Sequence, residues 1–251
     1  MPMLSIMRTV LGLVWSAISC LTALVLALLS ARFIPFVLTQ IGSQMWSANM
    51  LRISGINRPK VTFVSDKAQF KNWPEKAIIV CNHASQLDIN VCANVIPRPI
   101  VYLAKASIRK VPILGLLNER VGTVFIDRSN PSAAKASVDN LLKSLSKGIS
   151  VIVYPEGTRS TNGELNAFKK GAFYLAAGAN APVIPMHVHG TRQVLPKGGW
   201  LLRPNPVHVR FGEPICADSA SAADIACLSK ASFDSVSSMR EFHLSHVETP
   251  D

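Results

Sequence analysis

The chain has 251 residues, of which 49% are hydrophobic, and its 26 lysine and arginine residues outnumber its 15 aspartate and glutamate residues. This length allows one α/β domain with a full core and an appendage. The net charge of +11 suits an anionic partner, but the sequence has no zinc-ligand spacing, aromatic RNA-binding signature or basic helix. Composition therefore argues against nucleic-acid binding and favours an anionic membrane surface or an acidic substrate.

The amino-terminal segment Thr9–Ala31 contains no charged residue and consists mostly of leucine, valine, alanine and isoleucine. About 20 apolar residues are enough to cross the hydrocarbon core of a bilayer as a helix. A secretory signal peptide has a shorter apolar core and a small-residue cleavage site, so we expect this helix to be retained, with cleavage as the less favoured reading. The pattern leaves open whether the helix crosses the bilayer or enters one leaflet.

The next segment, Phe33–Leu51, is apolar but carries Gln40, Gln44 and Trp46, and its apolar residues recur at helical spacing. It predicts a helix that packs on the following domain or lies in the membrane interface. The first acidic residue of the chain is Asp66, and five basic residues precede it. This bias favours the cytoplasmic side of a membrane, as do five cysteines with no metal or disulfide pattern.

After these two segments, assigned to an amino-terminal unit over residues 1–55, apolar runs typical of strands alternate with helical patterns. The expected strands are Val61–Val64, Ala77–Cys81, Ile100–Leu103, Val121–Ile126, Ser150–Tyr154, Pro182–His187 and Val207–Phe211. The expected helices are Asp88–Val95, Ser107–Leu117, Pro131–Leu145 and Gly171–Ala177. This alternation predicts a layered α/β domain over residues 56–215, with a largely parallel or mixed sheet flanked by helices. The serine- and alanine-rich tail, 216–251, predicts a short helix or a segment that is loose beyond Glu241.

A histidine and an aspartate follow the expected strand Ala77–Cys81, within the segment Asn82–Asp88. Histidine can accept a proton near neutral pH because its unperturbed pKa is about 6.5, and a carboxylate on its other ring nitrogen fixes the tautomer. On a regular helix, residues five apart point about 140° from each other. His83 and Asp88 can therefore meet only if His83 lies in the loop or in an irregular first turn of the next helix. A structural histidine or a helix cap is the alternative reading.

Other expected strands also deliver polar residues at their ends. Val151–Ser160 joins an apolar strand to a turn in which glycine allows a close backbone approach and arginine offers a planar fork of donors for phosphate. Gly122–Arg128 again ends in an arginine, and Val183–Met186 completes the set. Ligands of α/β sheets bind at the carboxyl ends of the strands, so we predict that these residues share one site with His83. A solvated surface charge is the alternative for each arginine taken alone.

Together these segments resemble the four motifs of the glycerolipid acyltransferase family, in its lysophosphatidic acid acyltransferase (bacterial PlsC-like) branch. The motif Asn-His-x-x-x-x-Asp is matched at Asn82–Asp88, and Pro-Glu-Gly-Thr-Arg-Ser is matched in full at Pro155–Ser160. The other two motifs are matched at Lys105, Pro112, Gly115 and Arg128, and at Val183–Pro185. The resemblance runs from Ala77 to Gly190 and fades after Phe211. Its departures are Gln86 and Leu87, where many members carry an aromatic residue, and these bear on the choice of acyl group or acceptor.

The resemblance implies a membrane enzyme with the glycerol-phosphate acyltransferase fold, preceded by a membrane-associated two-helix hairpin. The implied reaction moves a fatty acyl group from acyl-CoA or acyl carrier protein to the free hydroxyl of lysophosphatidic acid, giving phosphatidic acid. The membrane would be the cytoplasmic one in a bacterium, with the catalytic domain facing the cytoplasm. No metal or organic cofactor is implied.

The resemblance also implies roles for single residues. His83 would be the general base and Asp88 the carboxylate that orients it. Glu156 would either orient the acceptor or brace Arg159. The residues implied to bind substrate are Lys105, Arg128, Glu156, Gly157, Thr158 and Arg159.

Other interpretations of the residues remain open. The same chemistry could act on another lysophospholipid, on glycerol-3-phosphate or on a lyso-aminolipid. A different class, which we favour less, is a membrane-anchored protein that binds lipid or hydrolyses thioesters, but a hydrolase would need a Gly-x-Ser-x-Gly elbow, which the sequence lacks. Ser85 could be an acyl-enzyme serine, although we favour a structural hydroxyl, and Cys81 is better explained as a small core residue than as a nucleophile. His187 and His189 alternate as residues of a strand do, or as a metal-binding pair would.

Overall fold

A computed structural model describes residues 2–29, 36–111, 115, 118–119, 123–126, 131–217 and 219–247. Its strands are β1 (Lys60–Phe63), β2 (Ile78–Cys81), β3 (Ile100–Lys105), β4 (Val124–Ile126), β5 (Ser150–Val153), β6 (Val183–His189) and β7 (His208–Phe211). Its helices are α1 (Pro2–Leu29), α2 (Phe36–Ile53), α3 (Asp88–Val95), α4 (Ala106–Arg109), α6 (Pro131–Ser146), α7 (Gly171–Gly178), α8 (Thr191–Val194) and α9 (Ala222–Val247), and two short 3₁₀ turns are η1 (Asp66–Ala68) and η2 (Phe70–Asn72). The expected alternation of strands and helices is confirmed.

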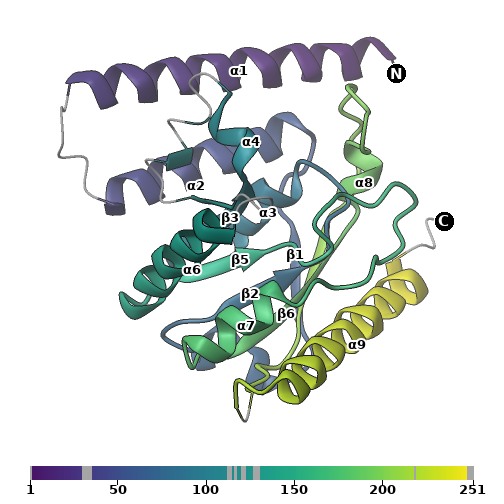
Figure 1. Ribbon diagram of the computed structural model, residues 1–251. Helices are drawn as coiled ribbons and strands as arrows, with labels where there is room; N and C mark the ends of the chain where they lie inside the picture. The colour runs from purple at the N-terminus through teal and green to yellow at the C-terminus, as the bar shows by residue number, and fades with distance from the viewer. Residues whose placement is uncertain are drawn as a thin grey trace.

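The strands of the described residues form one seven-stranded mixed sheet in the order β1-β7-β6-β2-β5-β3-β4. The strands from β6 to β4 are parallel to one another, while β7 is antiparallel to β6 and carries β1 alongside it. At the centre, Ile79 of β2 lies between Ile152 of β5 and Ile184 of β6. Helices cover both faces of the sheet (Figure 1), and this is why β2 is apolar at every position. The carboxyl ends of the parallel strands all reach the same edge.

The core is divided into two layers by the alternation of side chains along β2. Ile79 and Cys81 belong to the layer that contains Val91 of α3. Ile78 and Val80 belong to the opposite layer, which includes residues of α6, α7 and α9. Successive residues of a strand point to opposite faces, so β2 is fixed from both sides. The loop that follows β2 therefore starts from a rigid position.

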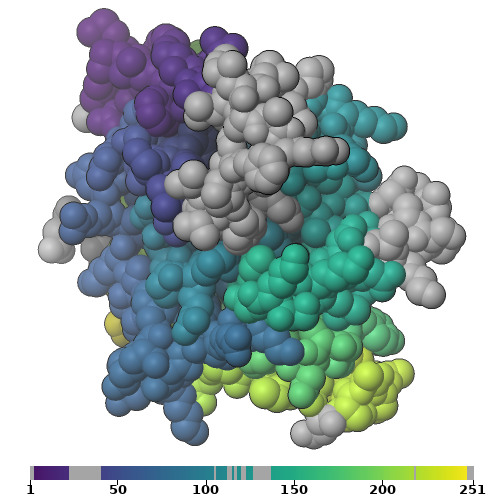
Figure 2. All heavy atoms as spheres, turned by 90° about the vertical axis from the view of Figure 1, so that its left-hand side faces the viewer, coloured from purple at the N-terminus to yellow at the C-terminus, as the bar shows by residue number. Residues whose placement is uncertain are grey.

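The amino-terminal helices lie against the side of the domain where α3 is found. In Figure 1, α1 crosses the top of the molecule above α2, and Figure 2 again shows α1 at the top, on the far side from α9. The span Met3–Thr22 is long and apolar enough to cross a membrane by length and composition, and only 11% of its most apolar stretch is buried. A helix of a soluble core would be mostly buried, so this exposure supports membrane association. A membrane-associated hairpin stays a prediction, because residues 30–35 lie outside the described residues.

The carboxyl-terminal tail differs from the expectation of a short helix or a loose end beyond Glu241. The structure instead has α9, a helix of 26 residues that continues to Val247. Its buried residues are Ile225, Leu228, Ser232, Val236, Met239 and His243. They are three or four positions apart, which is the spacing of one helix face, and this face packs on β6 and α7. The serine- and alanine-rich composition of the tail gave no sign of this buried face, which is visible only in the spacing of its residues along the chain.

Two expected elements also differ in extent in the structure. The helix expected over Ser107–Leu117 is interrupted, because α4 ends at Arg109, residues 110 and 111 are not helical, and Gly115 is helical again. Pro112 gives the physical reason, since proline lacks an N–H and disfavours helical backbone in the residue before it. Strand β4 occupies the last part of the range Val121–Ile126. The remainder of both expected ranges lies partly outside the described residues.

A buried pair of histidines joins α9 to β6. The Nδ1 atoms of His187 and His243 are 2.8 Å apart, so one neutral ring donates and the other accepts. Burial first, and then the charges of neighbouring histidines and arginines, lowers the pKa of His187 well below its ordinary value and the pKa of His243 to about 3. His187 thus has a structural partner on α9, and its alternation with His189 follows the period of a strand.

The histidine pair predicts acid sensitivity of the fold. Below about pH 6.5 the histidines of the unfolded chain bind protons, whereas folded His243 resists protonation down to a pKa of about 3. The free energy of unfolding should therefore decrease as the pH falls through this window. Thermal unfolding measured in detergent from about pH 8 to about pH 5 should show a falling midpoint. His243→Gln, which can still form hydrogen bonds but cannot titrate, should weaken this dependence, whereas exposed His246→Gln should not. Equal pH dependence in the two variants would contradict the assignment.

Candidate active site

The expected base and its carboxylate meet in the loop between β2 and α3. His83 lies in this loop and Asp88 is the first residue of α3, and the distance from His83 Nδ1 to Asp88 Oδ2 is 2.8 Å. This placement satisfies the constraint set by the five-residue spacing. The side chain of His83 is 15% exposed and that of Asp88 is 0% exposed. Because Nδ1 is held by the carboxylate, Nε2 is the ring nitrogen available to exchange a proton.

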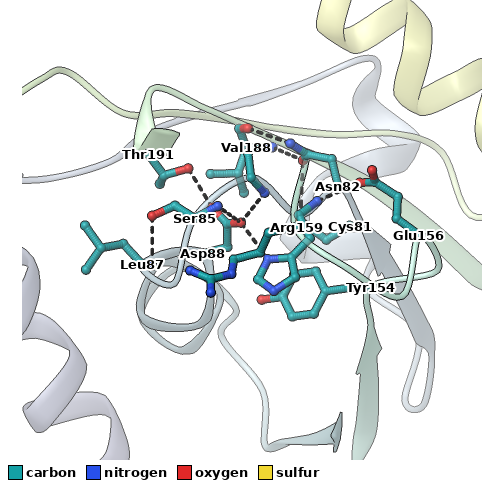
Figure 3. Close-up of polar contacts among 12 residues, drawn as sticks. Cys81, Asn82, Ser85, Leu87, Asp88, Tyr154, Glu156, Arg159, Val188 and Thr191 are labelled. Carbon is teal, nitrogen blue, oxygen red and sulfur yellow. Dashed lines mark hydrogen bonds and ion pairs between the residues drawn. The ribbon is translucent and has the colours of Figure 1, made fainter. Parts of the chain in front are cut away.

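The carboxylate of Asp88 receives hydrogen bonds from two segments of the chain, the His83 loop and the start of α8 (Figure 3). Besides His83, the backbone N–H groups of Ala84 and Ser85 donate to Oδ2 at 2.8 and 2.9 Å. Thr191, at the start of α8, donates its hydroxyl to Oδ1 at 2.6 Å. A buried charge is costly unless it is paired and hydrogen-bonded, and these donors meet that requirement. Sequence reasoning missed Thr191, because no local pattern relates it to a residue 103 positions away.

An aromatic ring supports the imidazole from one side. Tyr154 directly follows β5, and its ring is stacked on that of His83 with centroids 4.1 Å apart and an interplanar angle of 19°. Burial is the main cause that raises the pKa of Tyr154 well above its ordinary value, so the phenol stays neutral. The expected strand Ser150–Tyr154 ends at this residue. Its aromatic side chain at the end of the strand is the feature of the sequence from which a contact with His83 could have been predicted.

The carboxylate of Glu156 makes hydrogen bonds within the protein that were not expected from the sequence. Its buried carboxylate accepts the backbone N–H of His83 at 2.8 Å through Oε1. Its Oε2 accepts the backbone N–H and the side-chain amide of Asn166 at 3.0 and 2.8 Å. Both oxygens are therefore used within the protein, and neither has a hydrogen bond to Arg159 among the described residues. Glu156 braces the His83 loop.

Two more hydrogen-bond links fix this loop to its neighbours. Asn82 accepts the N–H of Val188 at 2.7 Å and donates to the carbonyl of Val188 at 2.9 Å, which attaches the loop to β6. Ser160 donates its N–H to the carbonyl of His83 at 2.7 Å. The first and third motifs are thereby joined through the backbone of His83 itself.

The two alternative nucleophiles, Ser85 and Cys81, both have buried side chains. Ser85 is fully buried, donates its hydroxyl to the carbonyl of Leu195 at 2.7 Å and accepts the N–H of Leu87 at 3.1 Å. Cys81 is also fully buried, and burial is the main cause that raises the pKa of its thiol well above its ordinary value. A neutral thiol is a poor nucleophile. Both residues fit the structural interpretation.

Arg159 is held close to the base by its neighbour in the chain. Ser160, which binds the carbonyl of His83, follows it directly, and the side chain of Arg159 is half-buried (Figure 3). Gly157 and Thr158 are exposed in the same turn. The φ angle of Gly157 is 75°, a conformation that glycine adopts without strain. An exposed backbone and a nearby guanidinium give this turn the means to bind an anion.

The other expected cations are less completely described. Lys105 is the last residue of β3, so its backbone reaches the edge of the sheet at which the His83 loop lies. Arg128 lies outside the described residues. Of the two departures from the family pattern, Leu87 is buried whereas Gln86 is exposed, so Gln86 is the one that can face a ligand.

The fold and the site together define an α/β enzyme with a carboxylate-oriented histidine at the carboxyl ends of parallel strands. Residues 61–189 match the model of the protein family described as Acyltransferase, and the chain belongs to that family.

The chain is also similar to individual proteins. It is 39% identical over 152 residues to the 1-acyl-sn-glycerol-3-phosphate acyltransferase of Cocos nucifera, covering 60% of this chain and 49% of that protein. It is 34% identical over 152 residues to 1-acyl-sn-glycerol-3-phosphate acyltransferase beta of Homo sapiens, covering 60% and 55%. The chain thus spans about half the length of the curated relatives it matches. Its fold resembles the crystal structure of the 1-acyl-sn-glycerophosphate (LPA) acyltransferase PlsC from Thermotoga maritima, with a TM-score of 0.77 and 21% identity over 98% of both chains.

The contact between Thr191 and Asp88 predicts that Thr191 is a positioning residue. Thr191→Val keeps the shape but removes the donor to Oδ1, and a hydrogen bond to a charged group contributes about 1.5–3 kcal/mol. We expect kcat of the acyl-transfer reaction implied by the sequence to fall about tenfold or more, with little change in the KM for the acyl donor or for the acceptor. Thr191→Ser should restore most of the lost kcat.

The control for this prediction is Thr62→Val, which removes a hydroxyl bonded to the carbonyl of Val209 in the sheet and should leave kcat unchanged. Thermal unfolding of each variant separates loss of fold from loss of positioning. A Thr191→Val protein with the kcat of the wild type would contradict the assigned role.

Proposed function

We propose that the protein transfers a fatty acyl group from a thioester donor to the free hydroxyl of lysophosphatidic acid, giving phosphatidic acid. The observation that carries this proposal is the 2.8 Å contact between His83 and buried Asp88, beside a turn that contains Arg159. The similarity of the chain to 1-acyl-sn-glycerol-3-phosphate acyltransferases supports the choice of acceptor.

In the proposed reaction the acceptor itself is the nucleophile. Nε2 of His83 accepts the hydroxyl proton as the hydroxyl oxygen attacks the carbonyl carbon of the thioester. A carbon–oxygen bond forms, the carbon–sulfur bond breaks, and His83 returns the proton to the departing thiolate. Asp88 stabilises the imidazolium that exists between the two transfers. No enzyme nucleophile is required, in agreement with the structural roles of Ser85 and Cys81.

The acceptor phosphate is proposed to bind at the carboxyl ends of β3 and β5. Arg159 supplies a charge-assisted fork of donors, and the exposed turn at Gly157 and Thr158 supplies backbone and hydroxyl groups. Lys105 and Arg128 are proposed as further cations for the phosphate. Glu156 acts on this site indirectly, by holding the His83 loop.

The substrates are proposed to reach the site from two sides. The acyl donor, acyl-CoA or acyl carrier protein, is water-soluble and comes from the cytoplasm, where the catalytic domain would lie. The acceptor is a membrane lipid, and the exposed apolar surface of α1 supports attachment to that membrane. Positive charge next to the amino-terminal helices suits the cytoplasmic leaflet.

A panel of acceptors tests the proposal. Purified protein in liposomes is given one acyl-CoA or one acyl carrier protein thioester, with lysophosphatidic acid, glycerol-3-phosphate, lysophosphatidylcholine and a lyso-aminolipid. We expect lysophosphatidic acid to be preferred, and His83→Ala to lower kcat by about 10²–10⁴-fold, the usual contribution of a general base. Thioester loss without any acceptor would indicate a hydrolase instead.

The His83→Ala protein should fold, because the Glu156 brace binds the backbone of residue 83 and Asp88 keeps its other donors. His246→Ala, an exposed change on α9, is the matched control and should retain full activity. Turnover like that of the wild type in His83→Ala would refute the mechanism. Preference for an acceptor without a terminal phosphate would refute the phosphate assignment, and Gln86 would then be the first residue to vary.

A second prediction concerns phosphate binding by Arg159. Arg159→Ala should raise the KM for lysophosphatidic acid about ten- to a hundredfold, as expected for a hydrogen bond to a charged group, with little change in the KM for the donor. Arg98→Ala is the matched control, since Arg98 is exposed and precedes the amino end of β3. Equal increases in the two KM values would mean that Arg159 supports the fold of the site rather than the phosphate.

A further inference from the structure

Residues 194–203 form a closed loop that joins three functional parts of the molecule. The N–H of Arg203 donates to the carbonyl of Val194 at 3.0 Å, and the N–H of Gly199 donates to the carbonyl of Pro196 at 3.0 Å. The first bond closes the base of the loop and the second shapes its tip. We call this segment the 194–203 loop.

The 194–203 loop is attached to both loops of the candidate active site. The carbonyl of Leu195 accepts the hydroxyl of Ser85, which lies between His83 and Asp88 in the chain. The ammonium of Lys197 donates to the carbonyl of Arg159 at 2.9 Å and to the hydroxyl of Thr158 at 3.3 Å. A displacement of the loop therefore reaches the base and the anion-binding turn.

The same loop is attached to α1. The N–H of Leu202 donates to the hydroxyl of Thr9 at 3.0 Å, and Figure 1 shows the segment after α8 beside the amino-terminal end of α1. Exposed apolar side chains cover that end of α1, among them Met3, which is 83% exposed, and Met7. The loop thus lies beside the exposed apolar end of a candidate membrane helix.

The tip carries an aromatic residue that has no role in the core. Trp200 is 66% exposed, and Gly198 and Gly199 directly precede it in the chain. Tryptophan is enriched at the boundary between membrane and water, because its ring is apolar and its N–H is polar. Lys197 and Arg203 lie on either side of it, and the chain has no acidic residue from 165 to 212. A surface that is apolar and positively charged matches a bilayer with anionic head groups.

We propose that the 194–203 loop is a second contact with the lipid bilayer, in addition to α1, with the indole of Trp200 placed among the head groups. The contact sets the depth of the active-site mouth at the membrane, so that an acceptor in the bilayer reaches Arg159 and His83 without leaving the lipid. The role in acceptor delivery rests on the proposed function, whereas the membrane contact does not.

Fluorescence quenching tests the membrane contact without any requirement for activity. Brominated acyl chains quench a tryptophan that enters the bilayer, and the chain has four tryptophans, so the difference between the wild type and Trp200→Phe isolates Trp200. Vesicles of phosphatidylcholine and phosphatidylglycerol, with and without bromine, are the probe. We expect the Trp200 signal to be quenched by the brominated vesicles. An unquenched signal would overturn the proposal. Shielding of the Trp200 indole that increases with protein concentration in detergent would also overturn it, because it would indicate contact with a second copy of the chain.

Kinetics test the delivery of the acceptor. Trp200→Ala should raise the apparent KM for long-chain lysophosphatidic acid in vesicles several-fold, while kcat and KM for a short-chain acceptor dissolved below its micellar concentration stay unchanged. Tyr174→Ala is the matched control, since Tyr174 is an exposed aromatic residue of α7, which Figure 1 shows at the other side of the molecule from α1. Equal losses on both acceptors, or no loss on either, would overturn a role in delivery. Absence of activity in the wild type would refute the proposed function and leave the quenching result valid.

Discussion

A carboxylate without contact to water must be compensated by donors, and the donors to Asp88 come from parts of the chain that are far apart. Two are backbone N–H groups of its own loop, one is the imidazole of His83, and one is the hydroxyl of Thr191 after β6. The loss of any one would leave the buried carboxylate with fewer donors, at a cost of about 1.5–3 kcal/mol for a hydrogen bond to a charged group. The loop between β2 and α3 therefore has one low-energy conformation, and that conformation fixes the tautomer and direction of His83.

A second buried carboxylate extends this order to the neighbouring turn. Glu156 binds the N–H of His83 and both donors of Asn166, and Ser160 binds the carbonyl of His83. The backbone of the base is thus held at both its N–H and its carbonyl by the segment that carries Arg159. Preorganisation of this kind is effective in catalysis because the groups need not reorganise when charge develops.

The local features of this site could be predicted from the sequence, and the long-range features could not. The apolar runs, the strand-end turns and the need for His83 to lie in a loop follow from periodicity and from the geometry of a helix. The long-range contacts depend on which strands are neighbours, and no local sequence pattern predicts the order of strands in a sheet. These contacts are the stacking of Tyr154, the bonds of Glu156 and the bond from Thr191. In α9 the information was present in the spacing of Ile225 to His243, but composition alone predicted only a short helix or a segment that is loose beyond Glu241. Pro112, in contrast, was a visible signal against a long helix after β3.

The structure also restricts how the reaction can be divided between protein and substrate. The hydroxyl of Ser85 and the thiol of Cys81 are committed to the scaffold, so the buried part of the site offers a base but no free nucleophile among the residues discussed. In the proposed reaction, catalysis comes from bringing the acceptor hydroxyl to Nε2 of His83 in the correct orientation, and positioning alone can supply a large part of a rate enhancement. For a lipid acceptor the reference surface for that positioning is the membrane itself. The 194–203 loop binds α1 through Leu202 and the anion-binding turn through Lys197. If α1 and this loop lie in the membrane as we propose, these contacts link the depth of the helix to the place where the acceptor hydroxyl arrives.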